Sequence, residues 1–251
     1  MIKPYLSVVI PCFNEEKNLK RGVLEEVRNY LKKQNYSYEV IISDDGSTDK
    51  SQEFLEKYCQ KYLNFILLKN PHGGKPFAVR VGVKKAKGKI VLFTDMDQST
   101  PIKEVKKLLP FFEKNYEVVI GSRGLEREGF SLFRRLASRI FRFFRQALLL
   151  RNISDTQCGF KAFKNKVAKD LFSQLLIFKK PAKVKGWRVG AFDVELLFIA
   201  QKRGYKIAEV PVIWEDKDIS MGKQRKFFKE SWTMLKEILR VKINDLRGLY
   251  D

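Results

Sequence analysis

The stretch Lys89-Ile-Val-Leu-Phe-Thr-Asp-Met-Asp-Gln-Ser-Thr-Pro101 decides the fold class of this chain. Its apolar run from Ile90 to Phe93 predicts a short strand buried on both faces, as in a parallel sheet. The run leads into Asp95 and Asp97, and Ser99-Thr100-Pro101 then predicts the start of a helix. Because side chains alternate along a strand, the two carboxylates can point to the same side at its carboxyl end. In open parallel sheets, that end is where ligands bind.

Asp95 and Asp97 are candidate ligands of a divalent metal. Two neighbouring carboxylates repel each other unless a cation lies between them. Ligation by oxygen alone suits Mg²⁺ or Mn²⁺. The alternative is an ordinary polar turn after a core strand, so the other strand ends have to decide between the two interpretations.

Strands and helices alternate along the first half of the chain. Apolar runs predict further strands at residues 6–12, 38–42, 65–68 and 116–120, with helices between them. This alternation predicts an α/β fold with a mostly parallel central sheet and helices on both faces. Polar residues stand at four strand ends: Asn14 and Glu15, Asp44 and Asp45, Asp95 and Asp97, and Gly121 with Arg123. Gathered on one edge, they would form an acidic metal pocket beside a phosphate-binding rim.

A glycine turn, His72-Gly73-Gly74-Lys75, follows the strand at 65–68. Glycines let the backbone approach a ligand closely, and the N–H groups at a helix start attract anions. The turn is therefore a candidate phosphate contact.

The composition favours an anionic partner and excludes several kinds of site. The 251 residues include 50 Lys and Arg against 29 Asp and Glu, a formal net charge of +21. Nucleic acid, a phosphorylated substrate or acidic lipid would each suit this charge. His72 is the only histidine, which argues against a metal cluster built on histidines and against a Ser-His-Asp triad, and three scattered cysteines predict neither a disulfide framework nor a zinc site. No apolar run has the length of a transmembrane helix, and the start of the chain does not resemble a signal peptide.

The second half contains two basic helices and a helix with acidic residues. Phe133 to Arg145 interleaves aromatic and arginine residues, which is typical of a solvated face over a core or of an interfacial helix on anionic lipid. Asp155 to Phe163 predicts a turn leading into a helix, and Ala191 to Ala200 predicts a helix that opens with Asp193. A strand is expected over 205–212, and the chain ends in a basic helix with an apolar stripe.

Six motifs in order resemble family 2 glycosyltransferases of the GT-A fold, over residues 5–215. These motifs are Ser7-Val-Val-Ile-Pro-Cys-Phe-Asn-Glu-Glu16, Asp44-Asp-Gly-Ser-Thr-Asp49, Gly74-Lys75, Asp95-Met-Asp97, Gly121-Ser-Arg123 and Asp155-Thr-Gln-Cys-Gly-Phe160. Within the family, Asp97-Gln-Ser-Thr-Pro101, Asp155 to Lys161 and Phe192-Asp-Val-Glu-Leu196 look most like dolichyl-phosphate β-glucosyltransferases. The resemblance implies a GT-A domain at 1–222, followed by a basic amphipathic C-terminal helix at 223–251.

The resemblance also implies roles for individual residues. The nucleotide would be held by Pro11, Phe13, Asn14, Glu15, Asp44, Lys75, Asp95 and Met96. Mg²⁺ or Mn²⁺ would be bound by Asp95 and Asp97, with Gln98 as a helper. The acceptor phosphate and the leaving group would meet Arg123, Arg134 and Ser138. Asp97, Arg123 and Asp193 are the candidate catalytic residues, with Asp193 as the general base if the acceptor is a hydroxyl.

The implied function is an inverting, metal-dependent hexosyltransferase. It would move a hexose, glucose from UDP-glucose in the first place, to a polyprenyl (dolichyl-type) phosphate at the cytoplasmic face of a membrane. An anionic membrane surface is the expected partner, since each nearby Lys or Arg adds about 1 kcal/mol of attraction. The alternatives are a polyprenyl-phosphate mannose synthase using GDP-mannose and a transferase to a saccharide hydroxyl. A basic nucleic-acid-binding protein is a further alternative, which the paired acidic residues disfavour because they repel a phosphate backbone.

Overall fold

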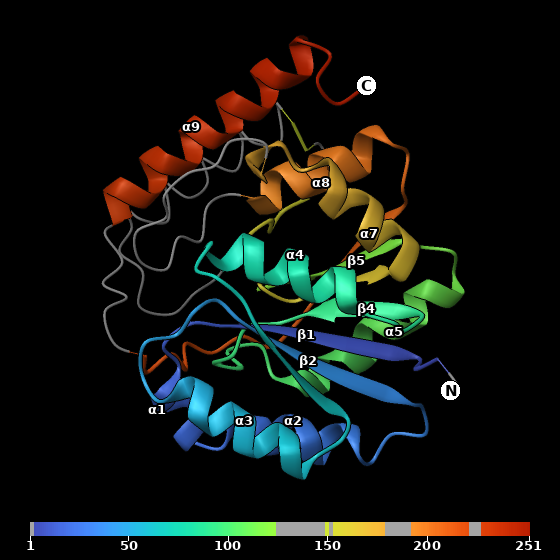
Figure 1. The fold of residues 1–251 in the computed structure, drawn as a ribbon. Coiled ribbons are helices and arrows are strands. Elements are labelled where there is room, and N and C mark those ends of the chain that lie inside the picture. The colour runs from blue at the N-terminus through green and yellow to red at the C-terminus, as the bar shows by residue number, and fades with distance from the viewer. Residues whose placement is uncertain (1–2, 124–148, 151–152, 179–191, 221–226) are drawn as a thin grey trace.

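The computed structural model describes residues 3–123, 149–150, 153–178, 192–220 and 227–251. Its centre is a seven-stranded sheet with the strand order β3-β2-β1-β4-β6-β5-β7, shown in Figure 1. The strands are β1 (Leu6–Cys12), β2 (Tyr38–Asp44), β3 (Phe65–Lys69), β4 (Ile90–Phe93), β5 (Val118–Ser122), β6 (Lys161–Lys164) and β7 (Ile207–Pro211). The helices are α1 (Glu16–Lys20), α2 (Val23–Leu31), α3 (Ser51–Lys61), α4 (Lys75–Lys85), α5 (Val105–Glu113), α7 (Asn165–Gln174), α8 (Phe192–Lys202) and α9 (Phe227–Leu246).

The predicted fold class is confirmed: six of these seven strands run parallel and β6 alone runs against them. The expectation of a turn leading directly into a helix after Asp155 is wrong, because residues 161–164 form β6 between β4 and β5. Only four residues long, this strand is too short to show a period of two in the sequence. Pairing with both β4 and β5 stabilises this short strand in the folded sheet.

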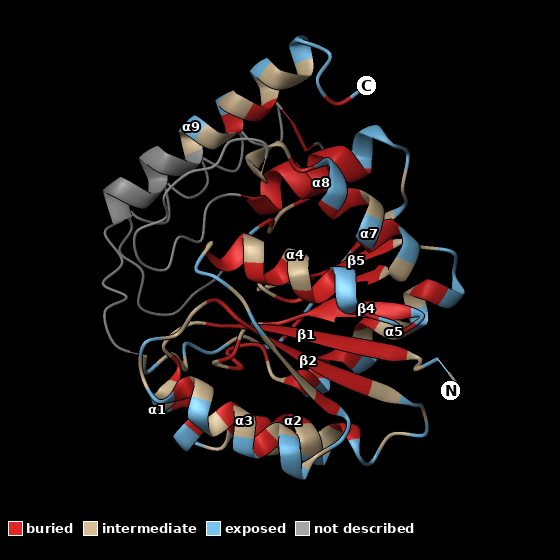
Figure 2. Ribbon diagram, viewed as in Figure 1, coloured by how far each residue is buried: buried red, intermediate tan, exposed pale blue. Residues whose placement is uncertain are grey.

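Helices cover both faces of the sheet, and each face has its own apolar core. One core joins β-strand residues such as Val9 and Phe93 to α4, α7, α8 and α9. The other joins Val8 and Leu92 to α1, α2, α3 and α5. Figure 2 shows the inner strands β1 and β4 buried along their whole length, whereas the edge strands β3 and β7 include partly exposed residues. Strands covered on both sides explain why the sequence showed continuous apolar runs.

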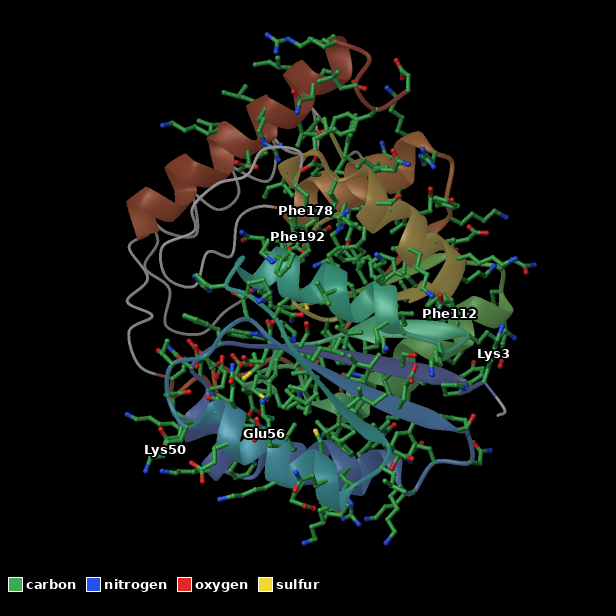
Figure 3. The ribbon with its side chains drawn as sticks, in the orientation of Figure 1. Lys3, Lys50, Glu56, Phe112, Phe178 and Phe192 are labelled. Carbon is green, nitrogen blue, oxygen red and sulfur yellow. The ribbon has the colours of Figure 1, made fainter. Side chains whose placement is uncertain are left out.

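Close packing against the sheet fixes α4 in place. A Cβ added at Gly82 of α4 would lie 2.4 Å from Val9 Cγ1, so only glycine lets the helix approach β1 this closely. In the same core, Phe192 (labelled in Figure 3) has its ring centroid 6.1 Å from that of Phe93 and 6.3 Å from that of Phe172. α4, through Gly82 in its second half, and the start of α8 are therefore both held against the sheet.

A buried carboxylate anchors the C-terminal helix to α8. Glu195 is fully buried, and its oxygens accept hydrogen bonds from the Leu176 N–H at 2.8 Å and the Tyr250 hydroxyl at 2.9 Å. Arg240 of α9 forms an ion pair with the same carboxylate at 2.9 Å. Within the described ranges, no helix is both long and apolar enough to cross a membrane.

Candidate active site

The structure gathers all four polar strand ends at the carboxyl edge of the sheet. The chain runs from β1 outward to β2 and β3 and then returns to place β4 on the other side of β1. The carboxyl ends of β1 and β4 therefore flank a point where the direction of winding reverses, which is where open α/β sheets bind ligands. Asn14 and Glu15 follow β1 there, and Asp95 and Asp97 follow β4.

Asn14 joins the end of β1 to the loop after β2. Its backbone has φ 54, a left-handed conformation that asparagine tolerates better than most residues. Its side-chain oxygen accepts the Thr48 N–H at 2.8 Å, and its own N–H donates to Ser47 Oγ at 2.9 Å. The Glu15 N–H similarly donates to Ser51 Oγ at 2.9 Å. These contacts make the first two motifs one rigid unit.

Asp44 and Asp45 are both fully buried and organise the loops around them. Asp44 accepts the Ser47 hydroxyl at 2.5 Å and the Gln52 side-chain amide at 2.6 Å, so its carboxylate holds its own loop. Asp45 accepts the N–H groups of Gly73 at 2.9 Å and Gly74 at 2.7 Å. Burial raises the pKa of Asp45, while those two N–H groups and His72 act in the opposite direction.

The expectation that the glycine turn offers its N–H groups to a phosphate is therefore wrong for Gly73 and Gly74, since Asp45 already accepts both. The turn instead fixes the start of α4. His72 adds a third link, with Nδ1 2.9 Å from Asp45 Oδ2, and its ring stacks on Phe13 with centroids 4.6 Å apart. Phe13 is thus placed next to the glycine turn.

Lys75, the first residue of α4, forms an ion pair with Asp95 Oδ1. Burial lowers the pKa of Lys75, but the charges of Asp95, Asp193 and Asp97 outweigh it and leave the pKa raised. Burial and then the charge of Asp95 raise the pKa of Asp97. Lys75 is therefore a cation among three carboxylates, two of which were predicted to bind metal.

The donors at the end of β4 fit a hard divalent cation. Burial raises the pKa of Asp97, and the neighbouring charge of Asp95 raises it further, so the two carboxylates repel each other. The side-chain oxygen of Gln98 is buried and has no hydrogen-bond partner among the described residues, which leaves it as a further oxygen donor. In the part of the chain that the structure describes, no three His, Cys, Asp or Glu side chains are grouped so that they could hold a metal ion. Two carboxylates and one amide oxygen are thus the groups here that could hold such a cation.

Arg123 is held by a carboxylate that the sequence placed in a separate motif. Its Nε lies 2.7 Å and its Nη2 2.8 Å from the two oxygens of Asp155, a bidentate pair. The guanidinium also lies over the Trp214 ring, 5.7 Å from its centroid. Burial alone would raise the pKa of Asp155, but Arg123 holds it well below its usual range.

Asp193, the candidate base, forms a buried ion pair. Lys161 Nζ is fully buried and lies 2.7 Å from Asp193 Oδ1, and it also donates to the carbonyl oxygen of Cys158. Gly159, which follows Cys158, lies against Asp95, so the Lys161–Asp193 pair belongs to the same site as Asp95. The structure thus brings Asp193 to the site from α8, a hundred residues away in the sequence from the end of β4.

Three residues of the site were missed by the sequence analysis. Lys161 binds Asp193, and Gly159 lies so close to Asp95 that an added Cβ would be 2.1 Å from its Oδ2. The charge of Asp218 contributes to the raised pKa of Asp97, and Asp218 Oδ1 accepts the Asn18 side-chain amide at 3.3 Å. The motif from Asp155 to Lys161 carried a signal for the first two; Asp218 had none.

Other predicted residues lie in less direct positions. Pro11 is in the buried strand β1, and the Met96 side chain is part of the core beneath the site, which leaves only its backbone to meet a nucleotide. Arg134 and Ser138 lie outside the described residues.

Comparison with known proteins agrees with this geometry. The profile of Glycosyl transferase family 2 matches residues 7–172. The chain belongs to this family. Human dolichyl-phosphate beta-glucosyltransferase is 37% identical, in an alignment covering 98% of this chain and 77% of the human protein. The enzyme of the same name from Dictyostelium discoideum is 35% identical, over 98% of this chain and 76% of its own length. Family membership favours a transferase over the nucleic-acid-binding alternative.

Solved structures confirm the GT-A fold of this family member. A glucosyl-3-phosphoglycerate synthase from Mycobacterium tuberculosis superposes with a TM-score of 0.64 and 18% identity, covering 95% of this chain and 78% of its own. A mannosyltransferase from Pyrobaculum calidifontis has a TM-score of 0.61 and 16% identity, covering 98% of this chain and 65% of its own. Both were solved with Mn²⁺.

We expect Asp155→Asn to lower the free energy of unfolding at neutral pH by about 3–5 kcal/mol, because it leaves Arg123 as an uncompensated buried charge. A carboxyl whose pKa is depressed by folding contributes stability above its unfolded pKa of about 3.9, and this is lost as the pH falls through its folded pKa. The variant should therefore lose stability less steeply than the wild type below about pH 4. Urea unfolding across this pH range measures both effects.

Asp170→Asn is the matched control, since Asp170 pairs with Arg203 where both side chains are partly exposed. It should cost no more than about 1 kcal/mol. Equal losses in the two variants would contradict the assigned role of Asp155.

Proposed function

We propose that this chain is an inverting glucosyltransferase that moves glucose from UDP-glucose to a polyprenyl phosphate of the dolichyl type. The observation that carries the proposal is the match, at 37% identity over 98% of the chain, to dolichyl-phosphate beta-glucosyltransferase. The site supports it, because carboxylates that repel each other lie beside Lys75 and Arg123, as binding a diphosphate with a divalent cation requires.

The reaction exchanges one bond at the anomeric carbon of glucose for another. An oxygen of the acceptor phosphate forms a bond to this carbon while the bond to the nucleoside diphosphate breaks, and the diphosphate leaves with the electron pair. Asp95, Asp97 and Gln98 would hold a Mg²⁺ or Mn²⁺ ion, which supplies Lewis-acid stabilisation of the departing charge. Lys75 would bind the diphosphate, while Phe13, Asn14 and Glu15 would line the nucleoside site.

The acceptor in this proposal needs to be positioned more than deprotonated. A phosphate monoester has a second pKa near ~6, so its oxygen is already anionic at neutral pH. Asp193 is fixed in an ion pair with Lys161, which suits a residue that orients charges around Lys75. Arg123 meets the site as one half of the Arg123–Asp155 pair, and Arg134 and Ser138 remain the proposed further phosphate ligands.

A membrane surface is the proposed location of the reaction, on the cytoplasmic side, because a polyprenyl chain is held in lipid. The described part of α9 supports this with an apolar stripe on its outer face. Leu239 and Ile243 are each 46% exposed and Leu246 is 75% exposed, at the spacing of one helix face. Lys236 precedes Leu239 by three residues and Arg247 follows Ile243 by four, so cations border the stripe, as in helices that lie on anionic lipid.

Asp97→Asn should abolish transfer of labelled glucose from UDP-glucose to polyprenyl phosphate while leaving the fold intact, because Asp97 lies beyond the end of β4 and outside both cores. The measurement is product formation with Mn²⁺ or Mg²⁺, with GDP-mannose as the competing donor. Circular dichroism checks the fold. Full wild-type activity in excess chelator would overturn the metal proposal, and preferred use of GDP-mannose would favour the mannose synthase.

Asp193→Asn distinguishes a phosphate acceptor from a hydroxyl acceptor. The variant should be less stable, because the buried ammonium of Lys161 loses its counter-charge. Asparagine keeps an oxygen that can accept from Lys161, so we expect the rate of the folded variant at saturating acceptor to fall less than tenfold. Losing a general base typically costs 10²–10⁴-fold. Steady-state kinetics with varied polyprenyl phosphate, at a temperature where the variant is folded, give the answer. A rate that falls 10²-fold or more in the variant, together with a rate that rises with pH in the wild type alone, would instead favour a saccharide hydroxyl as the acceptor.

The double variant Leu239→Asp, Leu246→Asp should weaken binding of the full chain to vesicles containing phosphatidylglycerol by about ten- to a hundredfold, because both side chains lose apolar contact with lipid. Binding of the wild type should also fall in 1 M salt, where the screening length is ~3 Å. Leu63→Asp is the matched control, since Leu63 is 92% exposed in the loop between α3 and β3 and is not part of α9. Co-sedimentation measures all three proteins. Equal binding by the two mutants would exclude α9 as the docking element.

A further inference from the structure

Lys75 and the proposed metal meet at the same carboxylate. The ammonium of Lys75 contacts Asp95 Oδ1, and Asp95 is one of the two carboxylates proposed to bind the cation. The backbone at the start of α4 is fixed by the hydrogen bonds from Gly73 and Gly74 to Asp45, so it cannot carry the ammonium away. Only the side-chain torsions of Lys75 can carry its charge away from Asp95.

Asp95 has equally little freedom. Its Oδ2 lies against the backbone of Gly159, where an added Cβ would be 2.1 Å away. Its carbonyl oxygen accepts the side-chain amide of Gln98 at 2.8 Å. The carboxylate therefore keeps Oδ1 toward Lys75, and a divalent cation that approaches this oxygen meets a positive charge already in place.

The charge balance changes when a diphosphate arrives. A diphosphate brings anionic oxygens that an ammonium binds as well as it binds a carboxylate. Lys75 can then turn from Asp95 to the diphosphate, which frees Asp95 for the metal and adds a bridging anion between the two cations. Each ligand thus removes an obstacle to the other, and such a coupling acts equally in both directions.

We propose that Lys75 is a positioning residue that makes the divalent cation and the donor diphosphate bind as a pair, by holding Asp95 until a diphosphate accepts its ammonium. The inference rests on the proposed function, because it takes Asp95 as a metal ligand. It adds that Lys75 opposes metal binding in the absence of nucleotide and favours it in the presence of nucleotide.

The test is a titration of the full chain with Mn²⁺, alone and with saturating UDP, in which electron paramagnetic resonance reports the free Mn²⁺. For the wild type we expect UDP to tighten Mn²⁺ binding by at least about tenfold, within the usual range of coupling between sites. Lys75→Met should bind Mn²⁺ about tenfold more tightly than the wild type without UDP, and UDP should then improve binding only slightly.

Two further variants separate this effect from others. Lys75→Arg keeps a cation at Asp95 and should exclude Mn²⁺ as the wild type does. Lys84→Met removes an exposed charge from the same helix and controls for net charge. It should leave the dissociation constant of Mn²⁺ unchanged both with and without UDP. If Lys75→Met does not fold, Lys75→Gln takes its place.

Mn²⁺ binding to Lys75→Met that is equal to or weaker than wild-type binding without UDP would overturn the inference and leave the transferase proposal in place. Absence of Mn²⁺ binding by the wild type, both with and without UDP, would overturn the proposed metal site as well. The two failures are therefore distinguishable in one set of titrations.

Discussion

Several carboxylates gather at the carboxyl edge of the sheet because each of them is paired with a cation. Asp95 has Lys75, Asp155 has Arg123 and Asp193 has Lys161. Removing one partner of a buried pair leaves a charge without compensation, which costs far more than a surface pair contributes. The three pairs therefore fix the positions of charged groups before any ligand binds, and fixed charges are what a reaction with a charged leaving group needs.

The antiparallel strand β6 makes two of these pairs possible. Lys161 is opposite Phe93 in the register with β4. The antiparallel strand β6 therefore begins at the edge of the sheet where its neighbours β4 and β5 end. The segment before it, from Asp155 to Gly159, consequently lies on the carboxyl edge beside Asp95. A parallel strand in the same place would have put its carboxyl end at that edge and carried this motif to the opposite one. The direction of this one short strand therefore decides that the Asp155 motif lies at the site.

The network around Glu195 connects this site to the C-terminal helix. Glu195 lies two residues after Asp193 on α8 and holds Arg240 of α9 and the hydroxyl of Tyr250. The proposed docking face on α9 is thus tied, through a buried carboxylate, to the helix that supplies Asp193. An enzyme whose acceptor is held in lipid needs a fixed relation between the lipid surface and the reacting groups, and this link would provide it.

The sequence by itself determined the α/β class, because strands buried on both faces leave continuous apolar runs, and it placed Asp95 and Asp97 at a ligand-binding edge. Through the family resemblance of its short motifs, it also predicted Asn14, Lys75, Arg123 and Asp193 as members of one site. It did not show strand β6, which is too short for a periodic signal, or the partners of these residues. That Arg123 binds Asp155, Asp193 binds Lys161, and Asp45 takes the N–H groups of the glycine turn was decided only by the tertiary structure. These contacts join residues 28 to 32 positions apart in the chain, and no local pattern specifies which distant charge will lie within hydrogen-bond distance.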